Sequence, residues 1–462
     1  MLSQATDEEL WTEFLDTSSG WEWNVEAGNV SGIVSLRAAD PTVPAARQAE
    51  TTLRVLRASL PAAALTATWS SGQPATYAEF RRARPEGWLQ SFPPGLENPA
   101  ARPCRQCRRS TAVPRGASSS APPTAEAERC QDCGLREQHA AYRARERAWS
   151  LRRLWDELRA QHPHVHLNVP DDLSALAALG ARSTGRRRHP EDAATRVALI
   201  CADGNAVGAF VAAATQRVNK GKVTRAIESA TTTAVLNATS RHCLLHGASG
   251  QVADVALIPH VIGGDDLIAS VSAHAVWDFV VTLCSEFDRA LAATWSPQES
   301  RSLEGLTVPT LSVGVAIHHA KRPLGDAIRE ASDGLDDAKQ QGMNSWIAWR
   351  DSVRGQPDSG HPAPRPATWL RAHLETIRTF ASVPRAHRST VMMHAAANHE
   401  AAEAWELVSE VTRRQGTRHL VERLVGSSTT PEGHLEDVQW ALQVAADLDP
   451  HPGGRSSQED SR

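Results

Sequence analysis

Apolar and polar positions alternate most regularly between residues 196 and 349, and the pattern there predicts a mixed α and β domain. Residues 196–202 form an almost continuous apolar run, as in a strand that is buried on both faces. Residues 252–260 and 267–272 are two further apolar runs joined by Gly-Gly-Asp-Asp, which is typical of a β-hairpin. Two more strands are predicted over 308–318 and 345–349, and helical spacing covers 206–218, 223–245, 275–294 and 324–341.

The predicted elements follow the order β-α-α-β-β-α-β-α-β. This is a ferredoxin-like core with one added helix and one added strand, so the predicted fold class is α+β. The first and second strands of such a core run in the same direction. The end of the first strand and the turn after the second therefore lie at one edge of the sheet.

The rest of the chain divides around this core, and its 462 residues favour two to four compact units. Strand, helix and strand are predicted over 32–36, 45–60 and 64–69, and a long helix over 137–161. The predicted division is an N-terminal α/β region (1–100), a cysteine-containing segment (101–136), a helical region with a basic linker (137–190), the core (191–352), a C-terminal helical domain (366–449) and a disordered tail (450–462).

Three acidic residues are predicted to meet at the shared edge of the sheet. Asp203 directly follows the first strand, and Asp265 and Asp266 belong to the hairpin turn. Carboxylates that converge in this way repel one another unless cations lie between them, and hard oxygen ligands suit Mg²⁺ or Mn²⁺. Two such ions can bind a triphosphate, activate an attacking hydroxyl and stabilise the leaving pyrophosphate.

The neighbouring residues fit the same chemistry. Gly263 and Gly264 allow a tight turn that a phosphate can approach. Lys339 lies at the predicted end of a helix, where its mobile charge can reach a polyphosphate. A Gly-Gly-Asp-Asp sequence on its own is equally explained by an ordinary hairpin turn. The matching first strand and the lysine helix in register favour the catalytic interpretation.

Four segments of the chain, ICADGNAVGAF, VIGGDDLIASV, SVGVAIHHAKRPLGDAI and LDDAKQQGMNSW, carry a family resemblance. In order and spacing they resemble the second palm domain of the large subunit of type III CRISPR effector complexes, often called Cas ten, and most closely its Cmr type. That palm is similar to those of diguanylate cyclases and adenylyl cyclases. The resemblance implies metal ligands at Asp203, Asp265 and Asp266, a turn at Gly263 and Gly264, and a nucleotide-binding lysine at Lys339.

The same resemblance implies an activity and partners. The palm would join ATP through 3′–5′ linkages into cyclic oligoadenylate, a second messenger of antiviral defence, with two Mg²⁺ or Mn²⁺ ions. Guide RNA, target RNA and other subunits of an effector complex would be the partners, and the C-terminal helices would contact a small subunit. Larger family members begin with an HD nuclease domain. This chain contains no His-Asp dipeptide, so DNA cleavage is not expected.

One residue departs from the family pattern and leaves two alternatives open. The family shows Asp-Gly-Asp at the first strand, whereas this chain has Asp203-Gly204-Asn205. Asn205 can bind metal or nucleotide through its amide oxygen but brings no charge. One alternative is therefore a catalytically silent palm that serves as an RNA-binding and protein-binding scaffold. The other is an enzyme like the diguanylate cyclases that uses GTP, which the Gly-Gly-Asp-Asp-Leu sequence and the cysteines disfavour.

The cysteine-containing segment predicts a zinc ribbon. Each of its two Cys-x-x-Cys pairs presents two thiolates on one turn, and two such turns complete a tetrahedral Zn²⁺ site that leaves no position for water. The zinc is thus expected to be structural. A redox role would need a thioredoxin-like context, which the sequence lacks. The four predicted ligands are Cys104, Cys107, Cys130 and Cys133.

Composition narrows the remaining choices. A formal charge of -4 provides no overall attraction to nucleic acid, so RNA contacts would depend on local basic stretches. Those stretches, near the first cysteine pair and over 143–153, are interleaved with glutamates, which favours a solvated surface over an RNA contact. No apolar run is long enough to span a membrane, and the acidic N-terminus does not resemble a signal peptide. A reducing cytoplasm is the expected location.

Overall fold

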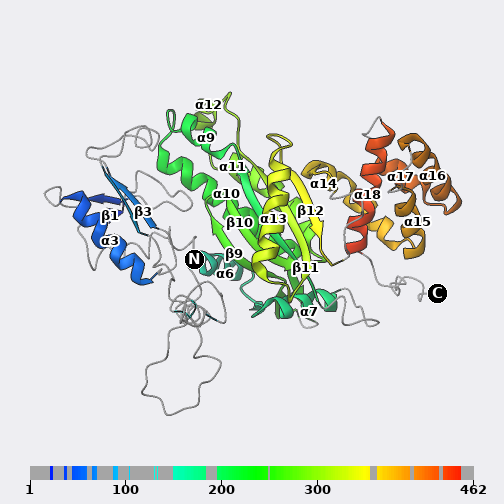
Figure 1. Cartoon of the computed structure of the whole chain (residues 1–462), viewed down its shortest axis with the longest axis horizontal. Helices are drawn as coiled ribbons and strands as arrows, with labels where there is room; N and C mark the ends of the chain where they lie inside the picture. Colours follow the sequence, from blue (N-terminus) through cyan, green and yellow to red (C-terminus); the bar gives the residue numbers. More distant parts are fainter. Residues whose placement is uncertain are drawn as a thin grey trace, which may run out of the picture. The chain divides into compact units, whose positions relative to one another are not determined.

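The structure is a computed structural model in which the chain forms two compact units, Met1–Arg153 and Leu154–Arg462 (Figure 1). The finer domain division expected from the sequence stays a prediction. The structure describes residues 21–23, 36–38, 44–59, 65–69, 87–91, 104, 130, 133, 149–183, 195–247, 250–353, 362–395, 400–425 and 430–448.

The first unit contains short strands and one amphipathic helix. Helix α3 (Ala45–Ser59) packs against an antiparallel pair formed by β3 (Leu65–Trp69) and β4 (Gly87–Ser91), and Ala49 and Leu53 lie on its buried face. A second antiparallel pair joins β1 (Trp21–Trp23) to β2 (Leu36–Ala38). The predicted helix over 45–60 and the strand over 64–69 are confirmed. Most of the strand predicted over 32–36 lies outside the described residues.

A six-stranded sheet forms the centre of the second unit. Its strand order is β13-β12-β11-β6-β10-β9, and the four strands β11-β6-β10-β9 have the order of a ferredoxin-like fold. Every neighbouring pair is antiparallel except β11 and β12. The α+β prediction for this region is confirmed. The strands are β6 (Arg196–Asn205), β9 (Leu257–Gly263), β10 (Asp266–Ser272), β11 (Thr310–His319), β12 (Trp346–Asp351) and β13 (Arg365–Pro366).

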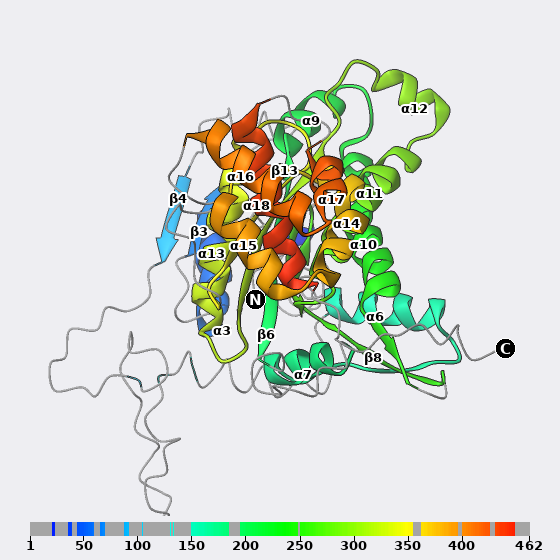
Figure 2. The same cartoon turned by 90° about the vertical axis from the view of Figure 1, so that its right-hand side faces the viewer.

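Helices cover both faces of this sheet (Figure 2). The face of Leu199, Cys201 and Ala316 packs against α13 (Leu324–Lys339) through small residues, among them Ala327 and Ala331. The opposite face contacts α10 and α11, which also pack against each other. The bounds of α10 and α11 are Lys220–His242 and Val276–Ala293, and two shorter helices of the same region are α9 (Val207–Ala214) and α12 (Pro297–Ser302).

The helix α13 can approach the sheet closely because β11 has a glycine beneath it. A Cβ atom on Gly314 would lie 2.0 Å from the carbonyl oxygen of Ala331 and 2.4 Å from the amide nitrogen of Leu335. Both atoms belong to the helix backbone, which cannot move away as a flexible side chain can. The spacing between β11 and α13 therefore depends on the missing side chain at position 314.

We expect Gly314→Ala to lower the free energy of unfolding by about 3 kcal/mol or more, because the helix must shift or the strand must distort. Urea denaturation measures the change. Gly325→Ala is the matched control, since a Cβ there meets no atom within 4 Å and alanine favours the helix by up to about 1 kcal/mol. Equal stability of the two variants would contradict the close packing of α13 on β11.

Two elements predicted from the sequence have wrong boundaries where the chain leaves the central sheet for a smaller, three-stranded one. The strand predicted over 252–260 is two strands in two sheets: β8 (Val252–Val255) and β9 are separated at Ala256, whose amide nitrogen donates to the carbonyl of Cys243 at 2.7 Å. The helix predicted over 223–245 ends at His242. The residues that follow form β7 (Leu244–His246), which pairs with β8.

The three-stranded sheet β5-β8-β7 is completed by β5 (His166–Asn168), which runs parallel to β8. It is preceded by α6 (Trp149–Gln161) and followed by α7 (Leu173–Ser183). The described part of the long helix predicted over 137–161 begins at Trp149, and residues 137–148 lie outside the described residues. Helix α7 contacts β6 and β10 on the central sheet.

The described residues in the C-terminal part of the second unit form helices. That they make up the separate helical domain predicted for 366–449 stays a prediction. The helices pack on the central sheet through aromatic contacts. Trp440 of α18 makes edge contacts with Trp277 of α11 and Trp369 of α14, with ring centroids 5.5 and 5.6 Å apart, and also approaches Trp349 of β12. The helices are α14 (Ala367–Ser382), α15 (Arg385–Ala395), α16 (Ala401–Arg414), α17 (Arg418–Leu424) and α18 (Pro431–Asp447).

Candidate functional site

The end of β6 and the start of β10 lie side by side, so the structure brings the predicted acidic residues to one edge of the sheet. Leu267 of β10 pairs with Ala202 of β6 in antiparallel register. The residues after Ala202 therefore neighbour the residues before Leu267. Asp203 comes from the first group, and Asp265 and Asp266 come from the second.

The side chains of Asp203 and Asp265 share a hydrogen bond. Burial, followed by this bond and the charge of Asp203, raises the pKa of Asp265 to about 7, and the charge of Asp266 adds to the effect. A hydrogen bond between two carboxyl groups requires a proton on one of them. Asp265 is thus partly protonated near neutral pH.

This pKa predicts that the affinity for metal depends on pH. A carboxyl group binds a cation only when it is ionised, so below pH 7 a metal must displace the proton of Asp265, whereas above pH 7 it need not. We expect the dissociation constant for Mn²⁺ to fall roughly tenfold between pH 6 and pH 8, as for one titrating proton. Isothermal titration calorimetry with Mn²⁺ measures it. Equal affinity at both pH values would show that Asp265 takes no part in binding.

Gly204 allows Asp265 to lie against β6. A Cβ atom at position 204 would come within 2.9 Å of an oxygen of Asp265 and 2.3 Å of a methyl carbon of Val207. The approach of Asp265 to Asp203 thus depends on a residue without a side chain between them. In the hairpin, Gly263 pairs with Asp266, and Gly264 has a φ of 62°, which favours glycine.

Lys339 forms an ion pair with Asp203. It is the last residue of α13, so the packing of that helix on β6 and β11 sets where the lysine begins. The two side chains are 30% and 31% exposed, so a ligand from solvent can reach both. The ammonium group therefore lies beside the acidic edge, which is the edge of the sheet that carries Asp203, Asp265 and Asp266.

The amide nitrogen of Asn205 faces β11 and the turn after α13, whereas the family pattern implies a residue that binds metal or nucleotide. Asn205 is 5% exposed, and its amide nitrogen lies 2.9 Å from Thr310 Oγ1, 2.8 Å from Ser312 Oγ and 2.9 Å from the carbonyl oxygen of Asn344. The two hydrogens of the amide are shared among these three acceptors. All three acceptors lie on β11 or in the turn after α13. Binding of nucleotide by Asn205 stays a prediction, and these contacts favour another role, which is developed below.

The first turn of α9 was not singled out in the sequence. Ala206, which precedes it, has a φ of 57°, a left-handed conformation that costs a non-glycine residue on the order of 1 kcal/mol and tends to occur at ligand sites. The helix has no side-chain cap, and amide groups in the first turn of a helix lack partners within the helix. Such groups next to Asp203 suit an anion. Left-handed backbone at an alanine has no reliable sequence signal.

Three of the four predicted zinc ligands are described, and they lie together in the first unit. The Sγ atoms of Cys104, Cys130 and Cys133 are within 4.8 Å of one another, and all three residues are buried. The amide nitrogen of Cys133 donates to the Sγ atom of Cys130 at 3.4 Å, as in a metal-binding turn. Cys107 lies outside the described residues. Buried thiols at this spacing fit Zn²⁺, which binds sulfur at about 2.3 Å.

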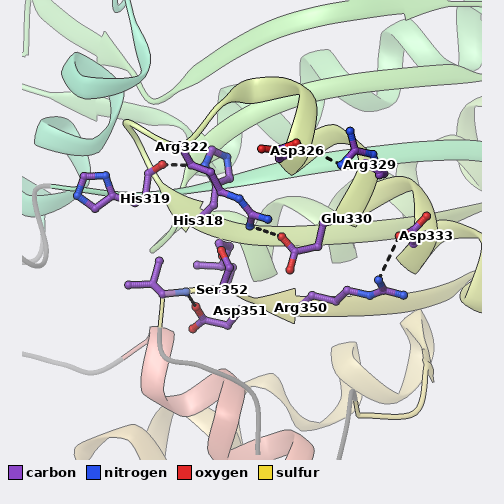
Figure 3. Close-up of polar contacts among 12 residues, drawn as sticks. His318, His319, Arg322, Asp326, Arg329, Glu330, Asp333, Arg350, Asp351 and Ser352 are labelled. Atoms are coloured by element: carbon purple, nitrogen blue, oxygen red, sulfur yellow. Dashed lines mark hydrogen bonds and ion pairs between the residues drawn. The ribbon is translucent and has the colours of Figure 1, made fainter.

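The histidines at the end of β11 lie beside Arg322 (Figure 3). His319 pairs with Arg196 at the opposite end of β6 from Asp203. His318 is buried, and its Nδ1 atom lies 2.9 Å from the carbonyl of His319. The charged neighbours are paired, as in the contact between Arg322 and Glu330. Among the described residues, the three cysteines are the one group of three potential ligands whose ligand atoms all lie within 4.8 Å of one another, so Asp203, Asp265 and Asp266 are not drawn together that closely.

The basic stretches near the first cysteine pair and over 143–153 lie outside the residues whose side chains the structure describes, so RNA binding by them stays a prediction. In the described part of the chain, no helix combines the length and apolar character needed to cross a membrane.

Comparison with known families places the central sheet. Residues 196–348, from the start of β6 into β12, match the family model described as "Cas10/Cmr2, second palm domain". These residues are similar to the second palm domain of the Cas10/Cmr2 family. The resemblance noted in the sequence is thereby confirmed for this part of the chain. No curated protein matches the chain significantly in sequence.

Several solved structures are similar to parts of this chain, with low sequence identity. A structure of Csm1 from T.onnurineus is 14% identical, with a TM-score of 0.38, over 61% of this chain and 40% of that one. A Csm1–Csm4 cassette in complex with pppApA is 17% identical (TM-score 0.37; 59% and 37% covered), and one in complex with cA4 is 13% identical (TM-score 0.37; 55% and 36% covered). This chain thus spans about two fifths or less of the length of each.

Proposed function

We propose that the chain is a nucleotidyltransferase whose palm polymerises ATP into cyclic oligoadenylate. The observation that carries the proposal is the contact between Asp203 and Asp265 at the acidic edge of a Cas10/Cmr2 palm, with Lys339 paired to Asp203. Carboxylates held this close repel one another, and divalent cations bound between them would remove that repulsion. The choice of ATP and of a cyclic product rests on the family resemblance.

The acidic edge has the chemistry of a site for two divalent cations. Asp203, Asp265 and Asp266 would hold Mg²⁺ or Mn²⁺, and the proton that Asp265 retains in the metal-free protein is what a cation would displace. When bound, such ions supply Lewis-acid activation of a hydroxyl group and neutralise a leaving pyrophosphate. The carboxylates themselves orient the reacting groups at the open end of β6.

Lys339 and the first turn of α9 would bind the polyphosphate. Lys339 pairs with Asp203. If bound cations balanced the charge of that carboxylate, the ammonium group would be available to bind a phosphate oxygen. The amide groups of the first turn of α9, which begins four residues after Asp203, would add partial positive charge. Gly263 and Gly264 leave room for phosphate beside the hairpin.

The setting of the proposed activity is an effector complex of type III CRISPR defence. Guide RNA, target RNA and further subunits would bind outside the palm, and the cysteine cluster of the first unit would hold a structural Zn²⁺. In this setting, bound target RNA would switch synthesis on.

A silent scaffold is the second candidate function, and Asn205 favours it. Its side chain adds no charge to the acidic edge and contacts β11 instead. A palm that kept its fold but not its activity would bind partners without making product. The ion pair between Lys339 and Asp203 favours the enzyme, because binding of RNA or protein subunits does not require a lysine beside these carboxylates.

Mass spectrometry of products formed from all four nucleoside triphosphates with Mg²⁺ or Mn²⁺ distinguishes these functions. We expect linear and cyclic oligoadenylates, from ATP alone. Cyclic di-GMP would instead assign the chain to the diguanylate cyclase type. If no product forms, the assay is repeated on the chain purified with its co-purifying RNA and subunits, and absence of product there would establish the scaffold.

A further inference from the structure

The amide of Asn205 lies at the centre of a small polar network that connects three parts of the palm. The acceptors of Asn205 make further hydrogen bonds of their own. Thr310 Oγ1 donates to the carbonyl of Met343 at 2.6 Å, and Ser312 Oγ accepts from the amide nitrogen of Trp346 at 3.3 Å. The network thus joins the end of β6 to β11 and to the turn over 340–345. That turn directly follows Lys339.

The partners of Asn205 require a hydrogen-bond donor at this position. The carbonyl oxygen of Asn344 can only accept, and the hydroxyl hydrogen of Thr310 is already committed to Met343. Two of the three partners therefore cannot donate to an oxygen atom, which fixes the orientation of the Asn205 amide. A carboxylate at position 205 would face these two oxygens without a hydrogen between them, and its burial would add to the cost.

The network is connected to Lys339 by a short path along the chain. Asn205 holds the carbonyl of Asn344, the turn over 340–345 follows α13, and Lys339 is the last residue of that helix. The other end of the path is also fixed, because Asp203 and Asn205 are two residues apart on β6 and so project from the same face. The carboxylate and the lysine that pairs with it are therefore positioned from the same strand end.

We propose that Asn205 is a positioning residue, which by donating hydrogen bonds to β11 and to the turn over 340–345 holds Lys339 where it meets the polyphosphate of a bound nucleotide. The inference rests on the proposed function and deepens it. It explains why asparagine stands where the family has the second aspartate of Asp-Gly-Asp: the amide donates hydrogen bonds, and an ionised aspartate cannot. An aspartate there weakens the site instead of restoring a metal ligand.

A double-mutant cycle with Lys339 tests this role in the full-length chain. The measured quantity is the dissociation constant of adenylyl imidodiphosphate, a non-hydrolysable ATP analogue, in the presence of Mn²⁺. We expect Asn205→Asp and Lys339→Ala each to weaken binding roughly tenfold, and the double variant to bind within about twofold of Lys339→Ala alone, because residues that act through one another are not additive. If the double variant weakened binding by the product of the two single effects, or if Asn205→Asp bound the analogue more tightly than wild type, the proposal would be overturned.

Asn237→Asp is the matched control. Asn237 on α10 is partly buried, and its amide nitrogen donates to Glu286 at 2.7 Å, away from the acidic edge. The same substitution there removes a hydrogen bond and adds a charge, yet leaves the dissociation constant of the nucleotide unchanged. If Asn205→Asp does not fold, Thr310→Val removes the network from the side of β11 without adding charge, and the same cycle is measured with it.

Hydrogen exchange keeps this inference separate from the proposed function. Amides of residues 340–346 exchange faster in Asn205→Asp than in wild type and in Asn237→Asp, with or without nucleotide. Unchanged exchange there would overturn the network. Wild-type protein that binds no nucleotide would instead refute the proposed function, and faster exchange in Asn205→Asp would still show that the amide holds the turn.

Discussion

Replacing Asp265 and Asp266 together by alanine is expected to lower product formation at least about 1000-fold, because the change removes two of the three carboxylates at the acidic edge. Asp203 alone, still paired with Lys339, would not hold two divalent cations. Initial rates of oligoadenylate formation measure the loss. The fold should survive, since burial of Asp265 costs stability instead of adding to it.

The matched control replaces two other carboxylates of the same domain. Asp333 and Asp336 are exposed on α13, and their change to alanine removes equal charge without touching the hairpin. We expect that variant to retain activity within about twofold and both variants to give the circular dichroism of wild type. Product formation by the double variant at the hairpin would mean that the metal site lies elsewhere.

The second large effect concerns zinc. Replacing Cys130 by serine is expected to lower bound zinc from about one ion per chain to nearly none, because a serine hydroxyl is not deprotonated as a thiol is and makes a poor ligand. The first unit should then lose much of its stability, since structural zinc supplies on the order of 10 kcal/mol to small domains. Inductively coupled plasma mass spectrometry measures the metal, and limited proteolysis follows the unfolding of Met1–Arg153.

Cys284→Ser provides the comparison for that experiment. Cys284 is an equally buried cysteine, on α11 in the second unit, and its thiol donates to the carbonyl of Leu311. Its replacement perturbs a core position but leaves the cysteine cluster intact, so zinc content stays at the wild-type level. Wild-type protein without zinc, or a Cys130→Ser variant that keeps it, would contradict the predicted ribbon.

The sequence predicted the sheet of the palm well because long apolar runs and a short hairpin depend on local pattern. The end of β6 and the Gly-Gly-Asp-Asp turn were placed at one edge by topology alone, and the antiparallel register of β6 with β10 agrees. The split of 252–260 was missed, because an apolar run looks the same whether it continues in one sheet or passes into another at Ala256. The pairing with β7 that causes the split is tertiary.

The candidate site was predicted as a set of residues but not as a set of contacts. Sequence placed Lys339 near a helix end, but its pairing with Asp203 depends on how α13 packs over Gly314. Likewise, a change from aspartate to asparagine at position 205 is a loss of charge in the sequence. Only the neighbouring acceptors, which include a backbone carbonyl far along the chain, show that the amide nitrogen has its own partners.

A crystal of the protein grown with Mn²⁺ and adenylyl imidodiphosphate provides the most direct test of the acidic edge as a metal and nucleotide site. Anomalous scattering at the manganese edge locates the ions independently of the refined atoms. We predict manganese peaks between Asp203 and the Asp265 and Asp266 pair, the triphosphate beside them, and Lys339 moved from Asp203 to a phosphate oxygen. Nucleotide bound elsewhere, or an edge that retains the lysine pair and no manganese at saturating Mn²⁺, would contradict it.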